Sequence, residues 1–437
     1  MPYIQVGEKE IPVFFIHEDR NWAWKRKNWI GDLSIIKDKT FEIAINIEEK
    51  CNELDFLAVF TYLKQFIIDD YSKDMQYSWA IEGEYLDSYK VRSSIIKQLC
   101  LDIPEWIPNK ELVRDERENR AVQSALSLIN SSKEISIDEL IRTHKLLATG
   151  IEDDDYGKIR TSPEIVGKFS SDRTRYEVIF EAPDPENVYD LLEQYITWWK
   201  NSSDLPAPLG AALAQLYFVE IHPFHDGNGR MGRLLTDKYL VRIPEQSFRP
   251  YSMSAVVRTH RSDDELTLSK DSAITGGSFP KLDNVNIDGI EISNLSREPL
   301  VPFICTSRNI LEKPYGYYRN LDLYSSKYEI DDYLRYMLFL QESAIEGAKK
   351  RIPLLHELYD FFQETKAYLN NNERSIIKNS YLADSKFVQF EDATPDILDA
   401  NEAEAAWEIL REAELLDEYG KPRFDVQAAK RAYELKK

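Results

Sequence analysis

The sequence is organised around one segment near its middle, which reads His222-Pro223-Phe224-His225-Asp226-Gly227-Asn228-Gly229-Arg230-Met231-Gly232-Arg233. Apolar residues recur at helical spacing over 208–221, before the segment, and Pro223 is expected to end that helix. Apolar residues recur at helical spacing again from Met231 to Leu240. The segment is therefore predicted to be a loop between two helices, and its second half is predicted to open the second helix.

The residue types of this loop suit the binding of a polyphosphate. A helix N-terminus offers unpaired N–H groups and a partial positive charge, and glycine lets a ligand approach the backbone. Arg230 and Arg233 are three residues apart, so their guanidinium groups share a helix face. Asp226 could hold Mg²⁺, and His222 could take a proton from an attacking hydroxyl group. Each residue alone is more often a cap, a structural histidine or a solvated charge, but their joint spacing favours attack on a Mg²⁺-bound nucleotide.

The loop resembles the signature of the Fic (Fido) family, His-x-Phe-x-Asp/Glu-Gly-Asn-Gly/Lys-Arg-x-x-Arg, at every fixed position. The resemblance implies transfer of AMP from Mg²⁺-ATP to a hydroxyl side chain of a protein. It implies that His222 is the base, that Asp226 holds Mg²⁺ and that Phe224 anchors the loop in the core. ATP is expected to contact the rest of the loop, namely Gly227, Asn228, Gly229, Arg230, Met231, Gly232 and Arg233.

A second motif, Ser78-Trp79-Ala80-Ile81-Glu82-Gly83, lies far upstream of the loop. Ser78 and Glu82 are four residues apart, so they lie one above the other on a helix, and Gly83 is a plausible helix end. The motif resembles the inhibitory Ser-x-x-x-Glu-Gly sequence of many Fic proteins. The resemblance implies that Glu82 pairs with Arg233 and blocks productive binding of the γ-phosphate. A similar sequence at 343–347 is rejected because its serine is one residue too close to Glu346.

A β-hairpin is predicted just before the catalytic helix. Two β-prone pieces, 164–169 and 176–180, are separated by polar residues. The position matches the flap of the Fic family, an edge on which a target segment docks by strand addition. The protein target, with a Ser, Thr or Tyr hydroxyl group, is therefore expected to dock at 164–180, and Val166 and Gly167 are expected to contact ATP. The alternative is an ordinary surface hairpin.

A tyrosine pair near the adenine is expected after the loop. Relatives carry a Tyr-Tyr pair soon after a segment similar to Tyr251–Val257. Here a polar stretch, 262–314, intervenes, and it contains an Asp288-Gly289 hairpin signal. Residues 262–314 are interpreted as an insertion, and Tyr317 and Tyr318 as the pair. Relatives often have an amide residue seven places after the second tyrosine, whereas this chain has Ser325.

Composition places this chain among ordinary globular proteins. It has 437 residues, a net charge of -21 and three widely spaced cysteines. The acidic balance disfavours nucleic acid or an acidic membrane as the main partner. The cysteines show no metal-ligand spacing, and neither a signal peptide nor a membrane-spanning run is visible. A cytoplasmic protein is therefore expected, and a homodimer is possible.

The predicted fold class is mainly α: a Fic/Fido helical bundle with a β-hairpin flap, a small aromatic-rich N-terminal extension and a C-terminal winged-helix-like module. Extended segments and core tryptophans are expected up to about residue 48. One helix is expected at Asn52–Asp70, and two between Asp331 and Leu369. The six expected parts are the extension (1–50), a helical region with the inhibitory motif (51–117), the Fic core with flap and loop (118–261), the insertion (262–314), the end of the core (315–370) and the C-terminal module (371–437).

Three other functions stay open from the sequence. The first is a different phosphoryl or nucleotidyl transferase on the same site, because the pose of the phosphates decides which bond is cleaved. The second is a hydrolase that removes AMP from its target, with Glu82 positioning water. The third is a non-enzymatic adaptor or regulator acting through the C-terminal module, which the intact His222 and the acidic tail disfavour.

Overall fold

The computed structural model describes residues 3–6, 9–59, 64–98, 116–130, 134–147, 156–170, 172–240, 286–287, 290–291, 314–383, 386–394, 397 and 399–437. Its elements are mostly helical, as predicted. The strands are β1 (Tyr3–Val6), β2 (Lys9–Phe15), β3 (Ile165–Phe169), β4 (Tyr176–Glu181), β5 (Asn286–Ile287) and β6 (Ile290–Glu291). The α-helices are α1 (Asp38–Val59), α2 (Lys64–Ala80), α3 (Ser88–Gln98), α4 (Glu116–Asn130), α5 (Ile137–Leu146), α6 (Val188–Asn201), α7 (Ala207–Ile221), α8 (Asn228–Leu240), α12 (Pro314–Lys327), α13 (Ile330–Glu364), α14 (Asn371–Leu382), α15 (Phe390–Ala393), α16 (Ala400–Glu412) and α17 (Val426–Leu435).

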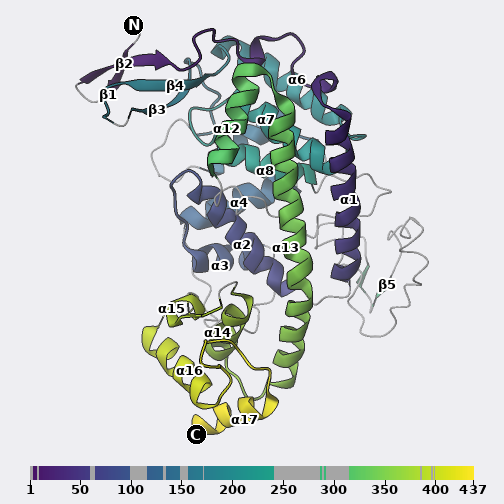
Figure 1. Ribbon diagram of the computed structural model, residues 1–437, viewed down its shortest axis with the longest axis vertical. Coiled ribbons are helices and arrows are strands. Elements are labelled where there is room, and N and C mark those ends of the chain that lie inside the picture. The colour runs from purple at the N-terminus through teal and green to yellow at the C-terminus, as the bar shows by residue number, and fades with distance from the viewer. Residues whose placement is uncertain are drawn as a thin grey trace.

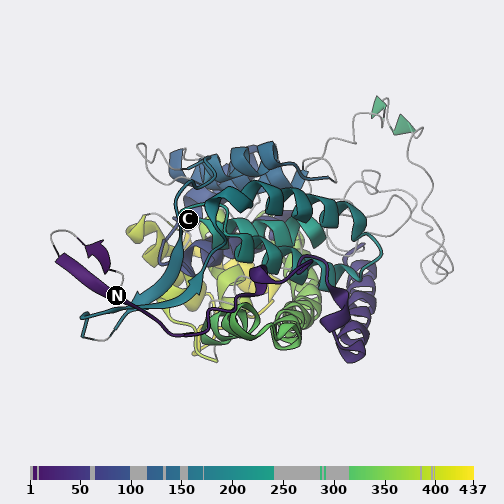
Figure 2. The ribbon, with the colours of Figure 1, turned by 90° about the horizontal axis from the view of Figure 1, so that it is seen from above.

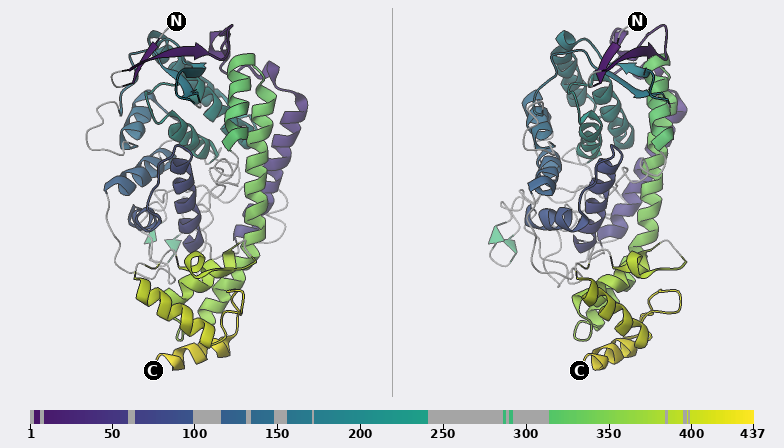
Figure 3. Two further views of the ribbon diagram at one scale, coloured as in Figure 1. Left: turned by 60° about the vertical axis from the view of Figure 1, so that its left-hand side comes forward. Right: turned by 90° about the vertical axis from the view of Figure 1, so that its left-hand side faces the viewer.

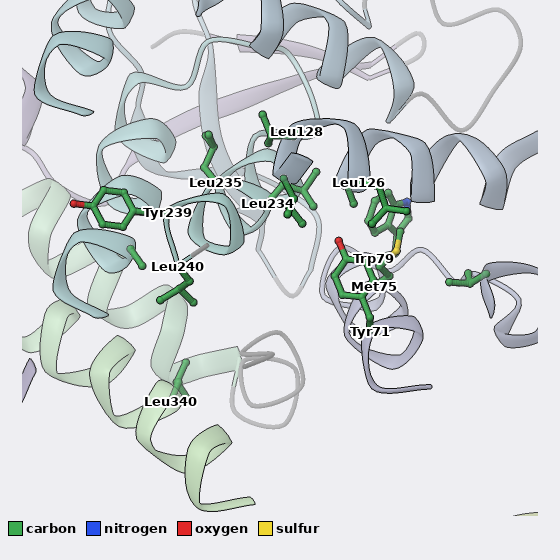
Figure 4. Close-up of a cluster of buried hydrophobic side chains, with 14 of the residues drawn as sticks. Tyr71, Met75, Trp79, Leu126, Leu128, Leu234, Leu235, Tyr239, Leu240 and Leu340 are labelled. Carbon is green, nitrogen blue, oxygen red and sulfur yellow. The ribbon is translucent and has the colours of Figure 1, made fainter. Parts of the chain in front are cut away.

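The helices α7 and α8 form the centre of the bundle. α7 is apolar and buried on all sides along almost its whole length, since the four consecutive residues Ala211–Ala214, which point in different directions, are all fully buried. α8 packs beside it, and α1, α6 and α13 cover α7. Figure 4 shows apolar side chains of α2, α4, α8 and α13 in one cluster, which joins the region of the inhibitory motif to the catalytic helix.

The long helix α13 runs beside α1 along the bundle (Figure 1). The prediction of two helices between Asp331 and Leu369 is wrong, because α13 continues through Pro353 to Glu364. A proline inside a helix costs about 3 kcal/mol. We attribute the continuity of α13 to its packing against α1, α7 and α12, which offsets that cost. The C-terminal helices α14–α17 follow at the end of the molecule opposite to the sheet (Figure 3).

The predicted hairpin is present, and it belongs to a larger sheet of order β1-β2-β4-β3. β3 and β4 are antiparallel, whereas β2 of the N-terminal extension pairs in parallel with β4. This parallel pairing was not predicted. The sheet projects from one end of the helices (Figure 2), and β3 forms one of its two outer edges.

Two other predictions of local structure need correction. Residues 38–48, expected to be extended, form the first half of α1. The helix predicted at Asn52–Asp70 is replaced by the end of α1 and the start of α2, which begins at Lys64. Both errors follow from reading apolar spacing alone, which does not locate helix ends well. The expected core tryptophans are confirmed, since Trp22 and Trp29 are buried.

The structure describes little of the predicted insertion and most of the predicted C-terminal module. Of the predicted insertion, 262–314, only β5, β6 and Pro314 are described, and β5 and β6 pair antiparallel as the Asp288-Gly289 signal predicts. In the C-terminal part, α16 is followed by an antiparallel bridge between Leu416 and Pro422, and then by α17. A winged-helix-like module stays a prediction for this part. Over the described ranges, every helix is too short or too polar to cross a membrane.

Candidate active site

α7 places His222 at the start of the loop. The helix ends there because His222 adopts a left-handed backbone conformation (φ 50°, ψ 59°), and its N–H donates to the Phe218 carbonyl. That conformation is unfavourable for a residue with a Cβ, so the surroundings must hold it. In one tautomer the imidazole Nδ1–H donates to the Val219 carbonyl 3.2 Å away, which leaves Nε2 as a base. Burial lowers the pKa of His222 to about 4, so the ring is neutral at pH 7.

The rings of Phe224, His144 and Tyr156 stack on one another and hold the loop in place. Phe224 is buried, as the family resemblance implies, and its ring centroid lies 3.6 Å from that of His144. The other face of His144 stacks on Tyr156 at 4.8 Å. His144 Nε2 lies 2.9 Å from the carbonyl of Asp226, and Nδ1 accepts from the N–H of Gly157. His144 therefore supports the structure of the loop, and both of its ring nitrogens are used.

Arg160 ties the loop to the base of the flap, a role that no spacing in the sequence indicated. Its Nε donates to the carbonyl of His222 at 2.6 Å, and its backbone N–H donates to the carbonyl of Pro223. The remaining guanidinium nitrogens donate to the carbonyls of Ser162 and Pro183, on either side of the hairpin. Arg160 is almost fully buried, so these bonds are shielded from water.

The side chain of Asn228 closes the loop on itself. Its Oδ1 accepts from the N–H of Phe224 at 3.1 Å, and its Nδ2 donates to the Phe224 carbonyl at 2.7 Å. Gly227, just before it, has φ +76°, which a side chain would oppose. Asn228 thus sets the shape of the loop; its contact with phosphate stays a prediction.

The two arginines of α8 converge on Glu82, which lies in the turn after α2. Glu82 Oε1 is 2.7 Å from Arg233 Nη2, which is the predicted pair, and Oε2 is 2.6 Å from Arg230 Nε. Arg233 also donates to the hydroxyl and the carbonyl oxygen of Ser78, at 2.8 and 2.7 Å. A Cβ at Gly229 would lie 2.4 Å from Glu82 Oε1, so glycine there permits the close approach. Both guanidinium groups are almost completely buried.

A second carboxylate, Glu84, was not predicted and completes this network. Its Oε1 is 3.1 Å from Arg230 Nη1, and its Oε2 is 3.1 Å from Arg117 Nη2 on α4. Arg230 therefore contacts three carboxylates, those of Glu82, Glu84 and Asp226. The sequence signal was present, because Glu84 is two residues after Glu82, but the family motif does not include it.

Asp226 lies at the exposed tip of the loop. Its side chain is 67 % exposed, and its Oδ2 accepts from Tyr156 at 2.6 Å and from Arg230 at 2.9 Å. In the part of the chain that the structure describes, no group of three or more His, Cys, Asp or Glu side chains could hold a metal ion. Mg²⁺ needs no such cage when phosphate oxygens and water supply most of its ligands. A single exposed carboxylate beside a phosphate site fits that requirement.

Two other loop residues face the protein interior. Met231 is buried, and its N–H donates to the carbonyl of Gly227 at 2.9 Å. Gly232 lies against α7, where a Cβ would come within 3.0 Å of Val219. Both residues therefore help α8 to pack, and their predicted contact with ATP could involve only their backbone.

The flap lies beside the loop. His225 Nδ1 is 2.9 Å from Glu164 Oε2, at the start of the hairpin. The register of β3 shifts between Val166 and Gly167, where a Cβ on the glycine would lie 2.2 Å from the carbonyl of Glu177. Val166 is half-exposed on the outer strand, so the predicted docking edge is accessible. The N-terminal extension braces the flap, since the indole N–H groups of Trp22 and Trp24 both donate to Glu181.

The tyrosine pair on α12 is split between core and surface. Tyr317 is buried, and its hydroxyl accepts from Gln215 of α7 at 2.7 Å. Tyr318 is 51 % exposed and can offer its ring to a base. Ser325, which stands where relatives often have an amide, is buried and hydrogen-bonded to Glu220 of α7. Burial raises the pKa of Glu220 to about 8, so this carboxyl group is mainly protonated at pH 7.

A comparison of the sequence with protein-family profiles finds a match over the residues that form this site. Residues 134–240, which include α5, the flap, α6, α7, the loop and α8, match the profile of the Fic/DOC family. Over these residues the chain is similar to the Fic/DOC family. This result confirms the resemblance seen in the loop sequence.

Several curated relatives of this chain are named protein adenylyltransferases. The protein adenylyltransferase fic-1 of Caenorhabditis briggsae is 30% identical over 199 residues, which are 44% of this chain and 36% of the relative. The fic-1 protein of Caenorhabditis elegans is 28% identical over 205 residues, 45% of this chain and 37% of the relative. The matches thus span well under half the length of these two relatives. Among solved structures, a Fic family protein from Desulfovibrio desulfuricans G20 matches with a TM-score of 0.43 and 17% identity, over 81% of this chain and 83% of that chain.

Proposed function

We propose that this protein transfers AMP from Mg²⁺-ATP to a hydroxyl side chain of a protein, and that Glu82 holds it inactive. The observation that carries the proposal is the loop geometry: His222 Nε2 is free as a base beside a helix N-terminus with two buried arginines. The protein adenylyltransferase names of the relatives point the same way. The proposed setting is the cytoplasm, in keeping with the cysteine pattern.

The reaction would proceed as follows. His222 Nε2 takes the proton of the target hydroxyl, whose oxygen forms a bond to the α-phosphorus of ATP. The bond from that phosphorus to the oxygen bridging to the β-phosphate breaks, and pyrophosphate leaves. Arg230 and Arg233 would hold the β- and γ-phosphates, and Asp226 would hold Mg²⁺, which when bound would supply positive charge to the phosphates. The accessible edge at β3 would align the target segment, as strand addition requires.

Glu82 opposes this arrangement because its carboxylate takes both arginines. A γ-phosphate near Arg233 would meet the negative charge of Glu82, whose oxygens lie within 2.7 Å of both guanidinium groups. ATP could then bind only in a pose that does not use Arg233. Both carboxylate oxygens of Glu82 already contact arginine side chains. These contacts disfavour a role of Glu82 in positioning water for AMP removal.

The test compares transfer from α-labelled and γ-labelled ATP with Mg²⁺, to the protein itself and to a lysate. The proteins are the wild type, Glu82→Gly and Glu82→Gly/His222→Ala. Label from the α-phosphate alone, in the Glu82→Gly variant alone, is the expected result. Label from the γ-phosphate would indicate a kinase. An absence of label in every lane would overturn the proposal in favour of AMP removal, another donor or an adaptor role.

Glu84 is expected to add to the inhibition through Arg230. Glu84→Gln in the Glu82→Gly background should raise AMP transfer a further ~5-fold, since an ion pair of a buried arginine with a partly exposed carboxylate contributes about 1 kcal/mol. The initial rate and the KM for ATP measure the effect. Glu346→Gln in the same background is the matched control, since the carboxylate of Glu346 on α13 lies 3.9 Å from Lys50 of α1 and is not part of the arginine network. An unchanged or slower rate with Glu84→Gln would show that Glu84 does not restrain Arg230.

A further inference from the structure

Tyr156 contacts two of the charged side chains that the proposed reaction brings to the phosphates, Asp226 and Arg230. Its hydroxyl donates to Asp226 Oδ2 at 2.6 Å and accepts from Arg230 Nη2 at 3.0 Å. Its ring is fixed by the stack on His144, which in turn stacks on Phe224 of the loop. The hydroxyl is therefore held in place by the same rings that support the loop.

Asp226 needs such a partner because it is exposed. A carboxylate whose side chain is 67 % exposed has little packing to fix its orientation. Tyr156 and Arg230 both donate to Oδ2, and the backbone N–H of Gly227 also donates to the carboxylate. Because Oδ2 is fixed by these side chains, the orientation of the whole carboxylate, and with it the position of Oδ1, is restricted. A carboxylate that binds a metal is usually oriented by a hydrogen bond of this kind.

The two partners of Asp226 differ once ATP binds. Arg230 is assigned to a phosphate in the proposed reaction, so its contact with Asp226 competes with the ligand. The phenol of Tyr156 is neutral at pH 7, as a tyrosine ordinarily is, so it continues to donate its proton to Asp226. It carries no charge that the phosphates would attract away.

We propose that Tyr156 is a positioning residue that orients Asp226 for Mg²⁺, so that removing its hydroxyl weakens the metal-dependent part of nucleotide binding. This inference rests on the proposed function, since it takes Asp226 as the Mg²⁺ ligand. It assigns Tyr156 no contact with the reacting atoms. The hydroxyl can be removed without the ring, because Tyr156→Phe preserves the stack on His144.

The experiment measures ATP affinity by calorimetry, with Mg²⁺ and with EDTA, in an inactive parent, Glu82→Gly/His222→Ala. The parent is expected to bind ATP more tightly with Mg²⁺. Adding Tyr156→Phe should reduce this Mg²⁺-dependent gain by about tenfold and leave the affinity in EDTA unchanged. Tyr189→Phe is the matched control, because Tyr189 is an exposed tyrosine on α6. Thermal melting of each protein verifies that the fold is preserved.

The outcomes separate the inference from the function on which it rests. A parent that shows no gain with Mg²⁺ overturns both, because Asp226 is then not a metal ligand. A parent that gains affinity, with an equal gain in the Tyr156→Phe variant, overturns the inference alone. An equal loss with Mg²⁺ and with EDTA also overturns it, since Tyr156 would then support only the shape of the loop.

Discussion

Replacing Glu82 with glycine is expected to raise AMP transfer by about 10- to 100-fold. The substitution removes a carboxylate that lies 2.6 Å from Arg230 and 2.7 Å from Arg233. A hydrogen bond to a charged group contributes about 1.5–3 kcal/mol, and each 1.4 kcal/mol corresponds to a factor of ten. Freed of Glu82, Arg233 can hold the γ-phosphate, and ATP can adopt the reactive pose. The measurement is the initial rate of label transfer from α-labelled ATP.

A matched pair of substitutions tests whether the effect is specific. Glu82→Gln removes the charge with little change in volume, and Glu346→Gln makes the same change in the similar sequence Ala344–Gly347. That second glutamate lies on α13, in a sequence whose serine has the wrong spacing. Activation by Glu82→Gln alone supports the inhibitory contact. Equal rates in the wild type and in both Glu82 variants would show that the ion pairs do not limit transfer.

The catalytic loop and its inhibitory partner were the parts most open to prediction from sequence. The residues of each motif stand at short spacings that place them together on a helix. Ser78 and Glu82, four apart, lie one above the other, and Arg230 and Arg233, three apart, share a helix face. The structure contains the expected pair of Glu82 with Arg233. That Glu82 also binds Arg230 follows from the closeness of α2 to α8, which no local pattern reports.

The supporting residues were missed because their partners are distant in sequence. Arg160 binds carbonyl groups of the loop and of the base of the flap. Since every residue has a backbone carbonyl, the sequence does not indicate which of them accept such bonds. Tyr156 precedes a glycine in a stretch that the family signature does not include. Glu84 depends on Arg117 and Arg230, which come from two other helices. Such contacts are set by tertiary packing, whereas periodicity reports only local geometry.

The errors in the fold have the same origin. Two helices were expected between Asp331 and Leu369, but α13 packs along the bundle and continues through Pro353. Of the tyrosine pair interpreted as lying near the adenine, Tyr317 is buried on Gln215 and Tyr318 is exposed, and their contact with the adenine stays a prediction. Adjacent residues on a helix point in different directions, so one member of such a pair usually faces the core.

Replacing His222 with alanine in the activated Glu82→Gly background is expected to reduce AMP transfer by about 10²- to 10⁴-fold, the usual contribution of a general base. ATP affinity should stay the same, because the imidazole is assigned to the target hydroxyl and not to the phosphates. Calorimetry of ATP binding and the rate of label transfer separate the two effects. A loss of ATP affinity would instead place His222 in the nucleotide site.

The pH dependence of the Glu82→Gly variant gives an independent test of the base. Burial lowers the pKa of His222 to about 4, below the ordinary value of a histidine. The neutral, proton-accepting form is therefore expected to persist as the pH falls from about 8 to about 6, and it is lost only as the pH approaches that pKa. The rate should stay flat over the first range and decline below it. An unshifted histidine would lose half its activity near pH 6.5, because protonation would then remove the base much earlier.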